Sequence, residues 1–263
     1  LKDQLEEAGA NVIVNGLLDI DGKDYIDTGY TEWGASGLAA VWAENNTRES
    51  IYEAFRRKET FATTGSRIKV RFFGGYDLTN VLQEEDPIKY AYANAVTMGS
   101  DMIQNESVAP QFMVWALRDL KRAPLDRVQI IKGWTELSGK PHEKIYDVAC
   151  SDGRKPNLNS GLCRDSRAKV NLNNCKISKN LGANELKAVW QDPDFNPDLK
   201  AFYYVRVLEN PTCRWSTWDA IKSGEKPRDD LPSTIQERAW SSPIWYVPDN
   251  EGITTSNILP DDI

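Results

Sequence analysis

The sequence lacks the residues that several common kinds of site require. It contains one histidine, His142, among 263 residues, whereas a histidine-based triad or a histidine-rich metal centre needs more than this. Lys and Arg number 32 against 39 Asp and Glu, a formal charge of −7, and nucleic acids and anionic membranes select basic surfaces. No stretch reaches the roughly 20 apolar residues of a membrane helix. We therefore expect no nucleic-acid partner and no membrane insertion.

A recognisable export signal and a starting methionine are also lacking. The first residue is Leu1, and no charged segment followed by an apolar core and a cleavage site precedes the rest. We expect that the chain either was processed or lacks its front part. The absence of any C-x-x-C spacing argues against a zinc site.

Four cysteines are present, all in the second half of the chain: Cys150, Cys163, Cys175 and Cys213. An even number in a loop-rich region favours two disulfides in an exported, periplasmic or extracellular protein over free buried thiols. Three pairings are possible. We favour Cys163 with Cys175, which closes a short polar loop, and Cys150 with Cys213, although spacing alone does not decide the connectivity.

The first half combines helices with an alternating strand. Residues 46–60 have helical spacing, with Asn46 as N-cap and Glu49 completing a capping box. Residues 67–73 alternate between apolar and basic, which is typical of a half-buried strand. A second helix is predicted over residues 87–98, with Asp86 as N-cap and Pro87 in the first turn.

From Pro110 onward the pattern is β. Strand-length runs rich in Val, Ile, Tyr and Trp cover residues 111–117, 127–134, 144–150, 202–208 and 239–247. Residues 138–141 are typical of a hairpin loop, and the long polar segment 151–181 is either stapled or functional. These runs predict an antiparallel β-sandwich.

Two groups of side chains are candidates for a substrate pocket. The first group lies close to the N-terminus of the helix predicted over residues 46–60, a position suited to binding an anion. The second group surrounds Gly65. The members are Trp42, Glu44, Asn46 and Arg48, then Thr63, Thr64 and Arg67. The alternatives are a capping box with a packed Trp42 for the first group and a simple tight turn for the second.

A further group of aromatic residues is typical of sugar-stacking surfaces, which leaves a glycan-binding module as an alternative. The group comprises Trp215, Trp218, Trp240, Trp245 and Tyr246. The competing interpretation is packing in the core or between domains. Trp240 and Trp245 are five residues apart, so a regular strand would place them on opposite faces unless residues 241–243 bulge.

Several longer segments carry a family resemblance. They are GLAAVWAENNTRE (37–49), RKETFATTG (57–65), IKVRFFGG (68–75), DPDF (192–195), FYYVRVLE (202–209) and QERAWSSPIWY (236–246). In this order they resemble the carboxy-terminal part of the bacterial family catalogued as domain of unknown function 3604. The resemblance covers residues 37–248.

The resemblance implies a relative of the polymerase-and-histidinol-phosphatase (PHP) class of metal-dependent hydrolases, usually exported. In that family the His and Asp metal ligands lie in an amino-terminal half, and this chain has neither a T-H-x-H segment nor a later D-x-H segment. We therefore expect no cofactor and no metal ligands in this chain, and divalent metal ions in the missing half. His142, beside the hairpin loop, is expected to have a surface or hydrogen-bonding role.

The resulting fold class is α+β: a carboxy-terminal remnant of a PHP-like α/β domain followed by a disulfide-stapled antiparallel β-sandwich. Residues 1–75 would end the catalytic domain, 76–109 form a helical connection and 110–263 form the sandwich. The expected function is the carboxy-terminal portion of an exported hydrolase of a phosphoester or related ester. Its partner would be the missing half or another chain, and a homo-oligomer is a further alternative. The alternative is a non-catalytic module that binds a glycan or a protein.

Overall fold

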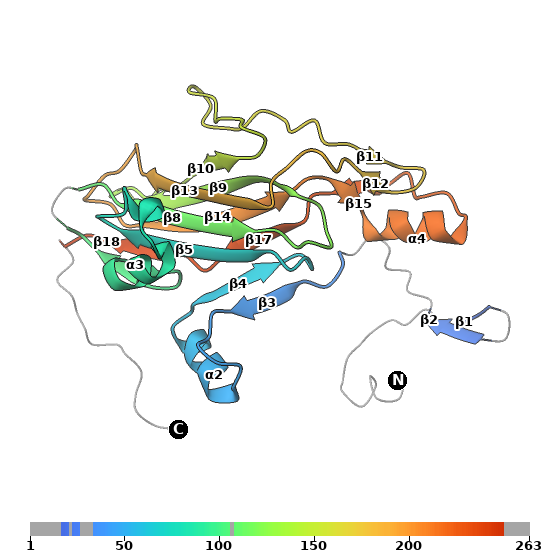
Figure 1. Cartoon of the computed structure of the whole chain (residues 1–263), viewed down its shortest axis with the longest axis horizontal. Coiled ribbons are helices and arrows are strands. Elements are labelled where there is room, and N and C mark those ends of the chain that lie inside the picture. The colour runs from blue at the N-terminus through green and yellow to red at the C-terminus, as the bar shows by residue number, and fades with distance from the viewer. Residues whose placement is uncertain (1–16, 21–22, 27–33, 106–107, 250–263) are drawn as a thin grey trace.

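The computed structural model describes residues 17–20, 23–26, 34–105 and 108–249. Most of them form antiparallel sheets, with few helices, so the fold is α+β in composition and dominated by β structure. Two larger sheets lie one over the other in Figure 1. A separate hairpin of β1 (Leu17–Ile20) and β2 (Lys23–Ile26) precedes them.

The larger sheet has eight strands. Its main path runs β10 (Pro141–Cys150), β9 (Leu125–Thr135), β14 (Ala201–Glu209), β17 (Arg238–Ser241), β4 (Thr60–Thr63) and β3 (Leu38–Val41). β18 (Ile244–Val247) also pairs with β14, and β7 (Asp101–Ile103) pairs with β18 in parallel. The second sheet has the order β13 (Glu185–Gln191), β8 (Gln111–Leu117), β5 (Lys69–Gly75) and β6 (Val96–Thr97).

Smaller elements lie around the two sheets. The helices are α2 (Arg48–Arg56), α3 (Pro87–Asn94) and α4 (Trp215–Ser223), with a 3₁₀ turn η1 (Val81–Gln83). Two short pairs, β11 (Val170–Asn171) with β12 (Lys176–Ile177) and β15 (Thr212–Cys213) with β16 (Thr234–Ile235), lie along the long connections.

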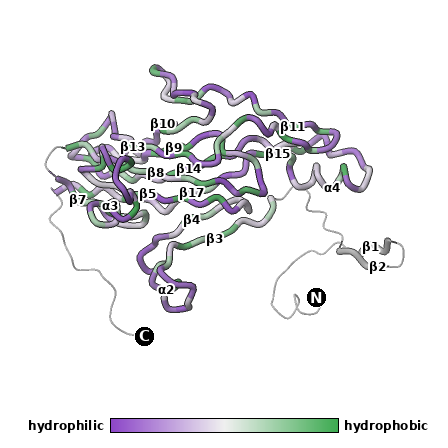
Figure 2. The backbone as a smooth tube through the Cα atoms, viewed as in Figure 1, coloured by the Kyte–Doolittle hydropathy of each residue, from purple (hydrophilic) through white to green (hydrophobic). Residues whose placement is uncertain are grey.

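The core lies between the two sheets because strand alternation places one apolar face of each toward the other. Tyr203, Val205 and Val207 of β14 are fully buried, as is Phe112 of β8. The Phe112 and Tyr203 rings lie 4.3 Å apart across the interface. In Figure 2 the green apolar residues concentrate along the central strands, whereas α2 is largely purple. This packing confirms the expected β-rich architecture, with two sheets sharing one core.

A second, smaller core lies on the outer face of the four-stranded sheet. Phe73 and Met113 of that face are buried beneath Leu78, Val81 and Ala91, which belong to the segment containing η1 and α3. The helix thus covers one end of this face, and the other end is left open.

Strand pairing crosses the expected domain limits. β5 pairs along its whole length with β8, and β4 pairs with β17, so segments before residue 75 and after residue 110 share both sheets. Residues 76–109 add β6 and β7 to the same sheets. The described residues from 34 onward therefore build one sandwich, while the assignment of residues 1–75 to a catalytic domain stays a prediction.

The expected helix over residues 46–60 is shorter and capped differently. α2 covers Arg48–Arg56, and Thr47, not Asn46, is its N-cap. The Thr47 hydroxyl accepts a hydrogen bond from the Ser50 amide, and the Ser50 hydroxyl accepts one from the Asn45 amide. The cap therefore lies one residue later than predicted and replaces the expected Asn46–Glu49 capping box; the Ser50 hydroxyl bonds back to the Asn45 amide rather than to the amide of the N-cap residue.

The second helix begins as predicted, since Asp86 accepts from the Lys89 amide at 3.0 Å and Pro87 is in the first turn. It ends at Asn94 rather than at residue 98, because Val96 and Thr97 pair with β5. The expected strand 239–247 divides at Ser242–Pro243 into β17 and β18. Strand pairing sets both the end of α3 and the break between β17 and β18, and the local sequence pattern carries no information about this pairing.

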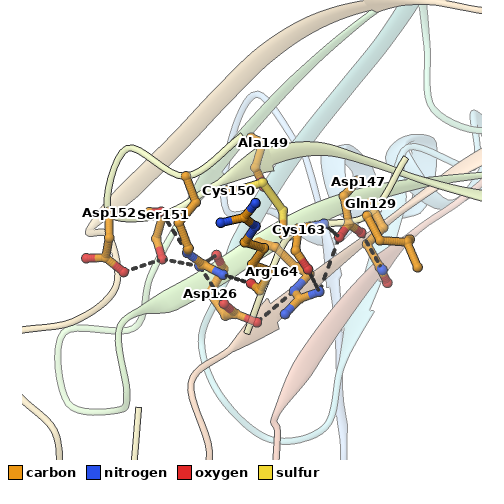
Figure 3. The surroundings of a disulfide bond; sticks show 12 residues. Asp126, Gln129, Asp147, Ala149, Cys150, Ser151, Asp152, Cys163 and Arg164 are labelled. Atoms are coloured by element: carbon orange, nitrogen blue, oxygen red, sulfur yellow. Dashed lines mark hydrogen bonds and ion pairs between the residues drawn. A yellow bond between two sulfur atoms is a disulfide. The ribbon is translucent and has the colours of Figure 1, made fainter. Parts of the chain in front are cut away.

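The disulfide pairing predicted from spacing is wrong. Cys150 is bonded to Cys163 and Cys175 to Cys213. After β10 the chain turns back along the same strand, where the Cys163 amide donates to Asp147 Oδ2 and the Asp147 amide donates to the Gly161 carbonyl. This return brings Cys163 to Cys150 at the strand end, in the polar surroundings drawn in Figure 3.

The second disulfide joins two distant short strand pairs. Cys175 lies in the turn between β11 and β12, and Cys213 ends β15. The Cys175 amide donates to the Asn171 carbonyl at 2.7 Å, and the Cys175 backbone has a positive φ of 54°. The long polar segment 151–181 is thus held by two disulfides. This agrees with the first of the two expectations for it, stapled or functional.

Candidate functional site

The four candidates near α2 are not gathered around one pocket. Trp42 is half-buried, and its indole Nε1 donates to the Val70 carbonyl at 2.7 Å. Its ring contacts Arg71 of β5, whose guanidinium carbon is 3.7 Å from the ring centroid. Glu44, Asn46 and Arg48 are exposed in the connection and first turn of α2. Of this group, only Trp42 joins a set of side chains from other elements.

The three candidates around Gly65 lie on a tight turn between β4 and β5. The Thr63 hydroxyl donates to the Ser66 carbonyl at 2.5 Å. The Thr64 hydroxyl accepts from the Arg238 amide at 2.9 Å, and the Arg67 amide donates to Asp119 Oδ2 at 3.0 Å. Because Leu38 pairs with Thr63, the chain enters the large sheet directly beside this turn.

Polar side chains, of which Ser66 and Glu209 are buried, gather where the chain enters the sandwich. We name this set the entry cluster: Ser66, Asp119, Arg122, Glu209 and Glu237. Glu209 and Ser66 are 0% and 1% exposed. Both carboxylate oxygens of Glu209, Oε2 of Glu237 and the Ser66 hydroxyl are buried and have no hydrogen-bond partner of normal geometry in the described part of the chain.

Electrostatics in the entry cluster keep one acid protonated. Burial raises the pKa of Glu209 to about 8, and the nearby Ser66 hydroxyl opposes the shift. The negative charges of Glu237 and Asp119 raise this pKa further, while Arg122 lowers it. At neutral pH the Glu209 side chain is therefore mostly a neutral carboxylic acid, which is able to donate one hydrogen bond and accept others.

Asp119 behaves differently from Glu209. Burial tends to raise its pKa, but hydrogen bonds from the Arg67 and Lys121 amides, with the charges of Arg122 and Arg67, bring the net pKa below the ordinary value. The cluster therefore contains an ionised carboxylate and a protonated one. Functional sites also contain pairs of acids whose pKa values are shifted in opposite directions by their surroundings.

Glu209 was not among the candidates from sequence, yet a signal was present. In the segment 201–209 the alternate residues Ala201, Tyr203, Val205 and Val207 face the core. Glu209 continues that series and is the single charged member. A charged residue on the apolar face of an alternating strand indicates a buried site or a strand end.

A buried ion pair lies at the opposite end of β14. Lys132 Nζ is 2.6 Å from Asp192 Oδ2, and these side chains are 4% and 0% exposed. Tyr203 donates to the same carboxylate at 2.7 Å, and burial followed by the charge of Asp192 raises the Tyr203 pKa. Asp194 accepts from Tyr146 and pairs with Lys144. Protein donors thus engage both carboxylates of the 192–195 segment.

The described residues do not fit a catalytic metal site. They contain no group of three or more His, Cys, Asp or Glu side chains arranged to hold an ion. His142 Nε2 lies 2.6 Å from Glu136 Oε1, and its ring stacks on Trp134 at 5.1 Å. We therefore derive no reaction step through a metal from these side chains.

The candidate aromatic group is dispersed over three places. Trp215 and Trp218 lie on α4, and Tyr246 is buried in the core at 1% exposure. Trp240 is half-buried and Trp245 is 46% exposed. Trp240 and Trp245 are therefore not buried in the sandwich core, whereas Tyr246 is; packing of the tryptophans between domains stays a prediction.

The remaining observations concern the environment and relatives of the chain. Two disulfides are typical of a non-cytoplasmic, oxidising compartment. No helix in the described residues is both long and apolar enough to cross a membrane. No curated protein and no solved structure matches the chain. A family model described as "Protein of unknown function (DUF3604)" matches residues 11–248. The chain therefore belongs to the DUF3604 family.

Proposed function

We propose that this chain is the carboxy-terminal portion of an exported, PHP-like metal-dependent hydrolase of phosphoesters or related esters. In this proposal the metal ions are bound by another part of the enzyme, on the same polypeptide or on a partner chain. The present residues close the catalytic domain and add the sandwich. The PHP relationship is the interpretation that we draw from the motif series between residues 37 and 248.

The observation that carries this proposal is the unsatisfied polarity of the entry cluster. Buried polar atoms in native proteins nearly always have a hydrogen-bond partner, and leaving one without costs about 1–3 kcal/mol. Four buried oxygen atoms of Ser66, Glu209 and Glu237 have no hydrogen-bond partner of normal geometry among the described residues, although the Ser66 hydroxyl lies close enough to Glu209 to lower its pKa. Donors from a further part of the enzyme, docked where the chain enters the sandwich, would satisfy these acceptors.

Export is supported by the redox chemistry of the chain. All four cysteines are in disulfides. Cytosolic reductants keep most thiols of mesophilic proteins reduced, whereas periplasmic and extracellular compartments permit stable disulfides. The proposal therefore places the enzyme outside the cytoplasm.

The first test is the intact mass of the protein from its native source, denatured but not reduced. We expect a species heavier than the 29.7 kDa of this chain, with divalent metal detected by elemental analysis of the native protein. A mass of 29.7 kDa, lowered only by the protons lost to two disulfides, would contradict the single-polypeptide form and leave a partner chain to be sought by co-purification.

Activity then tests the hydrolase itself. The metal-loaded assembly should hydrolyse a generic phosphomonoester or phosphodiester, and chelation should abolish this. Glu237→Gln in the entry cluster should weaken association of the two parts, whereas Glu44→Gln, which alters an exposed carboxylate outside the cluster, should not. Absence of metal and of ester hydrolysis in the assembly would overturn the proposal.

A second function is favoured by the outer face of the large sheet. Phe202 lies opposite Trp245 in register, and their rings are 5.1 Å apart. The Phe202 ring is nearly parallel to Tyr204, at 16° and 6.3 Å, and covers Gly133, where a Cβ would approach it to 2.3 Å. Aromatic rings on a sheet face suit a non-catalytic module that binds a glycan or a protein.

The two functions are separated by binding assays on the sandwich chain alone. If the module binds glycans, Trp245→Ala should abolish binding, whereas Trp218→Ala on α4 should not. Trp218 is a suitable control because its 39% exposure is close to the 46% of Trp245. An absence of glycan binding, or equal losses in the two variants, would contradict a glycan site on this face.

A further inference from the structure

A small pocket lies on the outer face of the four-stranded sheet, beside α3. Its volume is about 150 Å³. Six residues from four segments line it: Trp42, Lys69, Arg71, Ile88, Trp115 and Leu117. We name it the tryptophan pocket. Trp42 comes from the connection after β3, Ile88 from α3, and the others from the paired strands β5 and β8.

Strand register places the cations and indoles of this pocket in one row. Arg71 lies directly opposite Trp115, and Trp115 lies directly opposite Lys187 of β13. The Arg71 guanidinium stacks on Trp42 at 3.7 Å, and the Lys187 ammonium lies 3.9 Å above Trp115. Lys69, on the same face of β5, is exposed. The pocket therefore combines an apolar floor with positive charge at its rim.

Arg71 is held in a fixed orientation. It donates through Nη1 to the Tyr92 hydroxyl at 2.6 Å, and Tyr92 in turn donates to the buried Glu59. Burial, with the neighbouring Glu59, raises the pKa of Tyr92 to about 12, so this phenol stays protonated and keeps donating. A guanidinium has five N–H groups, and only one of them is engaged by Tyr92.

Carboxylates do not neutralise the pocket. Among the described residues none lines it, and none lies in an ion pair with Lys69 or Arg71. The two nearby acids lie at the edge of the pocket and each pairs with a cation that does not line it: Glu59 with Arg57 at 3.4 Å, and Glu185, which also accepts from Trp115 Nε1, with Lys187 at 3.1 Å. A positive, apolar-floored pocket in a chain of net charge −7 is not explained by overall composition.

We infer that the tryptophan pocket binds a small organic anion. Its phosphate or carboxylate group would pair with Arg71 and Lys69, because a guanidinium fork matches both oxyanions. Its apolar or aromatic body would contact Trp115, Leu117 and Ile88. This inference goes beyond the proposed hydrolase and does not depend on it, since binding requires neither metal nor turnover.

The test is isothermal titration of the full chain with three probes: phenyl phosphate, inorganic phosphate and benzyl alcohol. Phenyl phosphate carries both recognised parts, and each of the others carries one. We expect phenyl phosphate to bind at least about tenfold more tightly than either, with an affinity that falls as salt screens the charges. Equal affinity for benzyl alcohol, or no detectable binding of phenyl phosphate at millimolar concentration, would overturn the inference.

Variants localise the binding. Arg71→Gln should weaken phenyl phosphate binding by about tenfold or more, which corresponds to one charge-assisted hydrogen bond. Lys69→Gln should weaken it by a few fold and, because Lys69 is exposed, should leave the fold intact even if Arg71→Gln does not fold. The matched control is Lys179→Gln, which removes the same charge from an exposed position outside the pocket. Equal losses in Lys69→Gln and Lys179→Gln would contradict this site.

Discussion

Two buried ionisable side chains, Lys132 and Glu209, lie at opposite ends of β14 and are stabilised in different ways. At one end Lys132 Nζ lies 2.6 Å from Asp192 Oδ2, and the same carboxylate accepts a hydrogen bond from the Tyr203 hydroxyl. At the other end Glu209 has no partner of normal geometry in the described residues. The charge of Lys132 is compensated by Asp192. Glu209 instead avoids the free-energy cost of a buried charge by staying protonated.

The protonated state of Glu209 leads to a pH-dependent stability. Its folded pKa of about 8 exceeds the ordinary 4.5, so between these values the unfolded state releases the proton and the folded state keeps it. Stability is therefore lost as pH rises through this window, by at most about 1.4 kcal/mol per pH unit. Glu209→Gln cannot ionise and should gain about 2–4 kcal/mol relative to the parent between pH 5 and pH 8.

Urea denaturation of parent and Glu209→Gln at pH 5, 6.5 and 8 measures this difference. The other titrating groups are common to both proteins, so the change in their difference reports on this carboxyl group. Leu158→Ala, at a fully exposed position and without an ionisable group, serves as a control with a pH-independent difference. A constant difference between parent and Glu209→Gln would show that Glu209 ionises normally.

Lys132 provides a second prediction at the residue scale. Lys132→Met removes one partner of a buried pair and should destabilise the fold by about 3–5 kcal/mol, because the Asp192 charge is left buried without a countercharge. The double variant Lys132→Met/Asp192→Asn should recover part of this loss. Thermal or urea unfolding at pH 7 measures both. If the double variant is as unstable as the sum of the two single changes, the two side chains do not interact as described.

At the scale of elements, the cap of α2 differs from the one expected from sequence. Asn46, Thr47 and Glu49 all suit a helix start, and sequence pattern alone did not rank them correctly. In the structure Thr47 accepts from the Ser50 amide at 3.2 Å, and Ser50 accepts from the Asn45 amide at 3.1 Å. The choice depends on where the chain leaves β3, since this sets which residue has extended backbone geometry.

Two alanine substitutions test this cap. Thr47→Ala should lower stability by about 1 kcal/mol, because it removes the side-chain acceptor of the first turn. Asn46→Ala, at the neighbouring exposed position, should change stability by less than about 0.5 kcal/mol. Chemical denaturation of the two variants gives the comparison, and a larger loss for Asn46→Ala would indicate the capping box that the sequence predicted.

At the scale of the whole molecule, the disulfides tie the long polar connection to the sandwich. The Cys150–Cys163 and Cys175–Cys213 bonds span 13 and 38 residues. Chain-entropy estimates give about 3 kcal/mol for the shorter loop and about 4 kcal/mol for the longer one. Removing Cys175 and Cys213 together should therefore cost more stability than removing Cys150 and Cys163.

Non-reducing peptide mapping by mass spectrometry checks the pairing, and unfolding of the two double Cys→Ala variants checks the energies. We expect linked peptides containing Cys150 with Cys163 and Cys175 with Cys213. A peptide linking Cys163 to Cys175 would restore the pairing favoured by spacing. Equal destabilisation of the two variants would show that loop length does not control their contributions.

The local pattern predicted much of the architecture correctly. Residues 111–117 form β8 with the predicted bounds, and alternation in residues 202–208 lies within β14. Asp86 and Pro87 begin α3 as expected. These features depend on side-chain periodicity and on hydrogen bonds between near neighbours, which the amino-acid order specifies directly.

The candidate site was predicted less well. Trp42 lies in a pocket, but its partners Arg71 and Trp115 come from strands distant in sequence. Thr63, Thr64 and Arg67 flank Ser66, whose hydroxyl lies near the buried acid Glu209, and spacing did not connect this acid to them. Strand pairing creates these neighbours, and no periodicity within one segment contains that information.

By itself, the sequence determined the β-rich class, the positions of the main strands, the family and the low prospect of a histidine metal centre. Only the tertiary structure decided the disulfide partners, the shared sheets across residues 75 and 110, and the groups that meet at the entry cluster and the tryptophan pocket. The physical reason is range. Periodicity and capping act over a few residues, whereas pairing, burial and the pKa values that follow from it depend on which distant strands become neighbours.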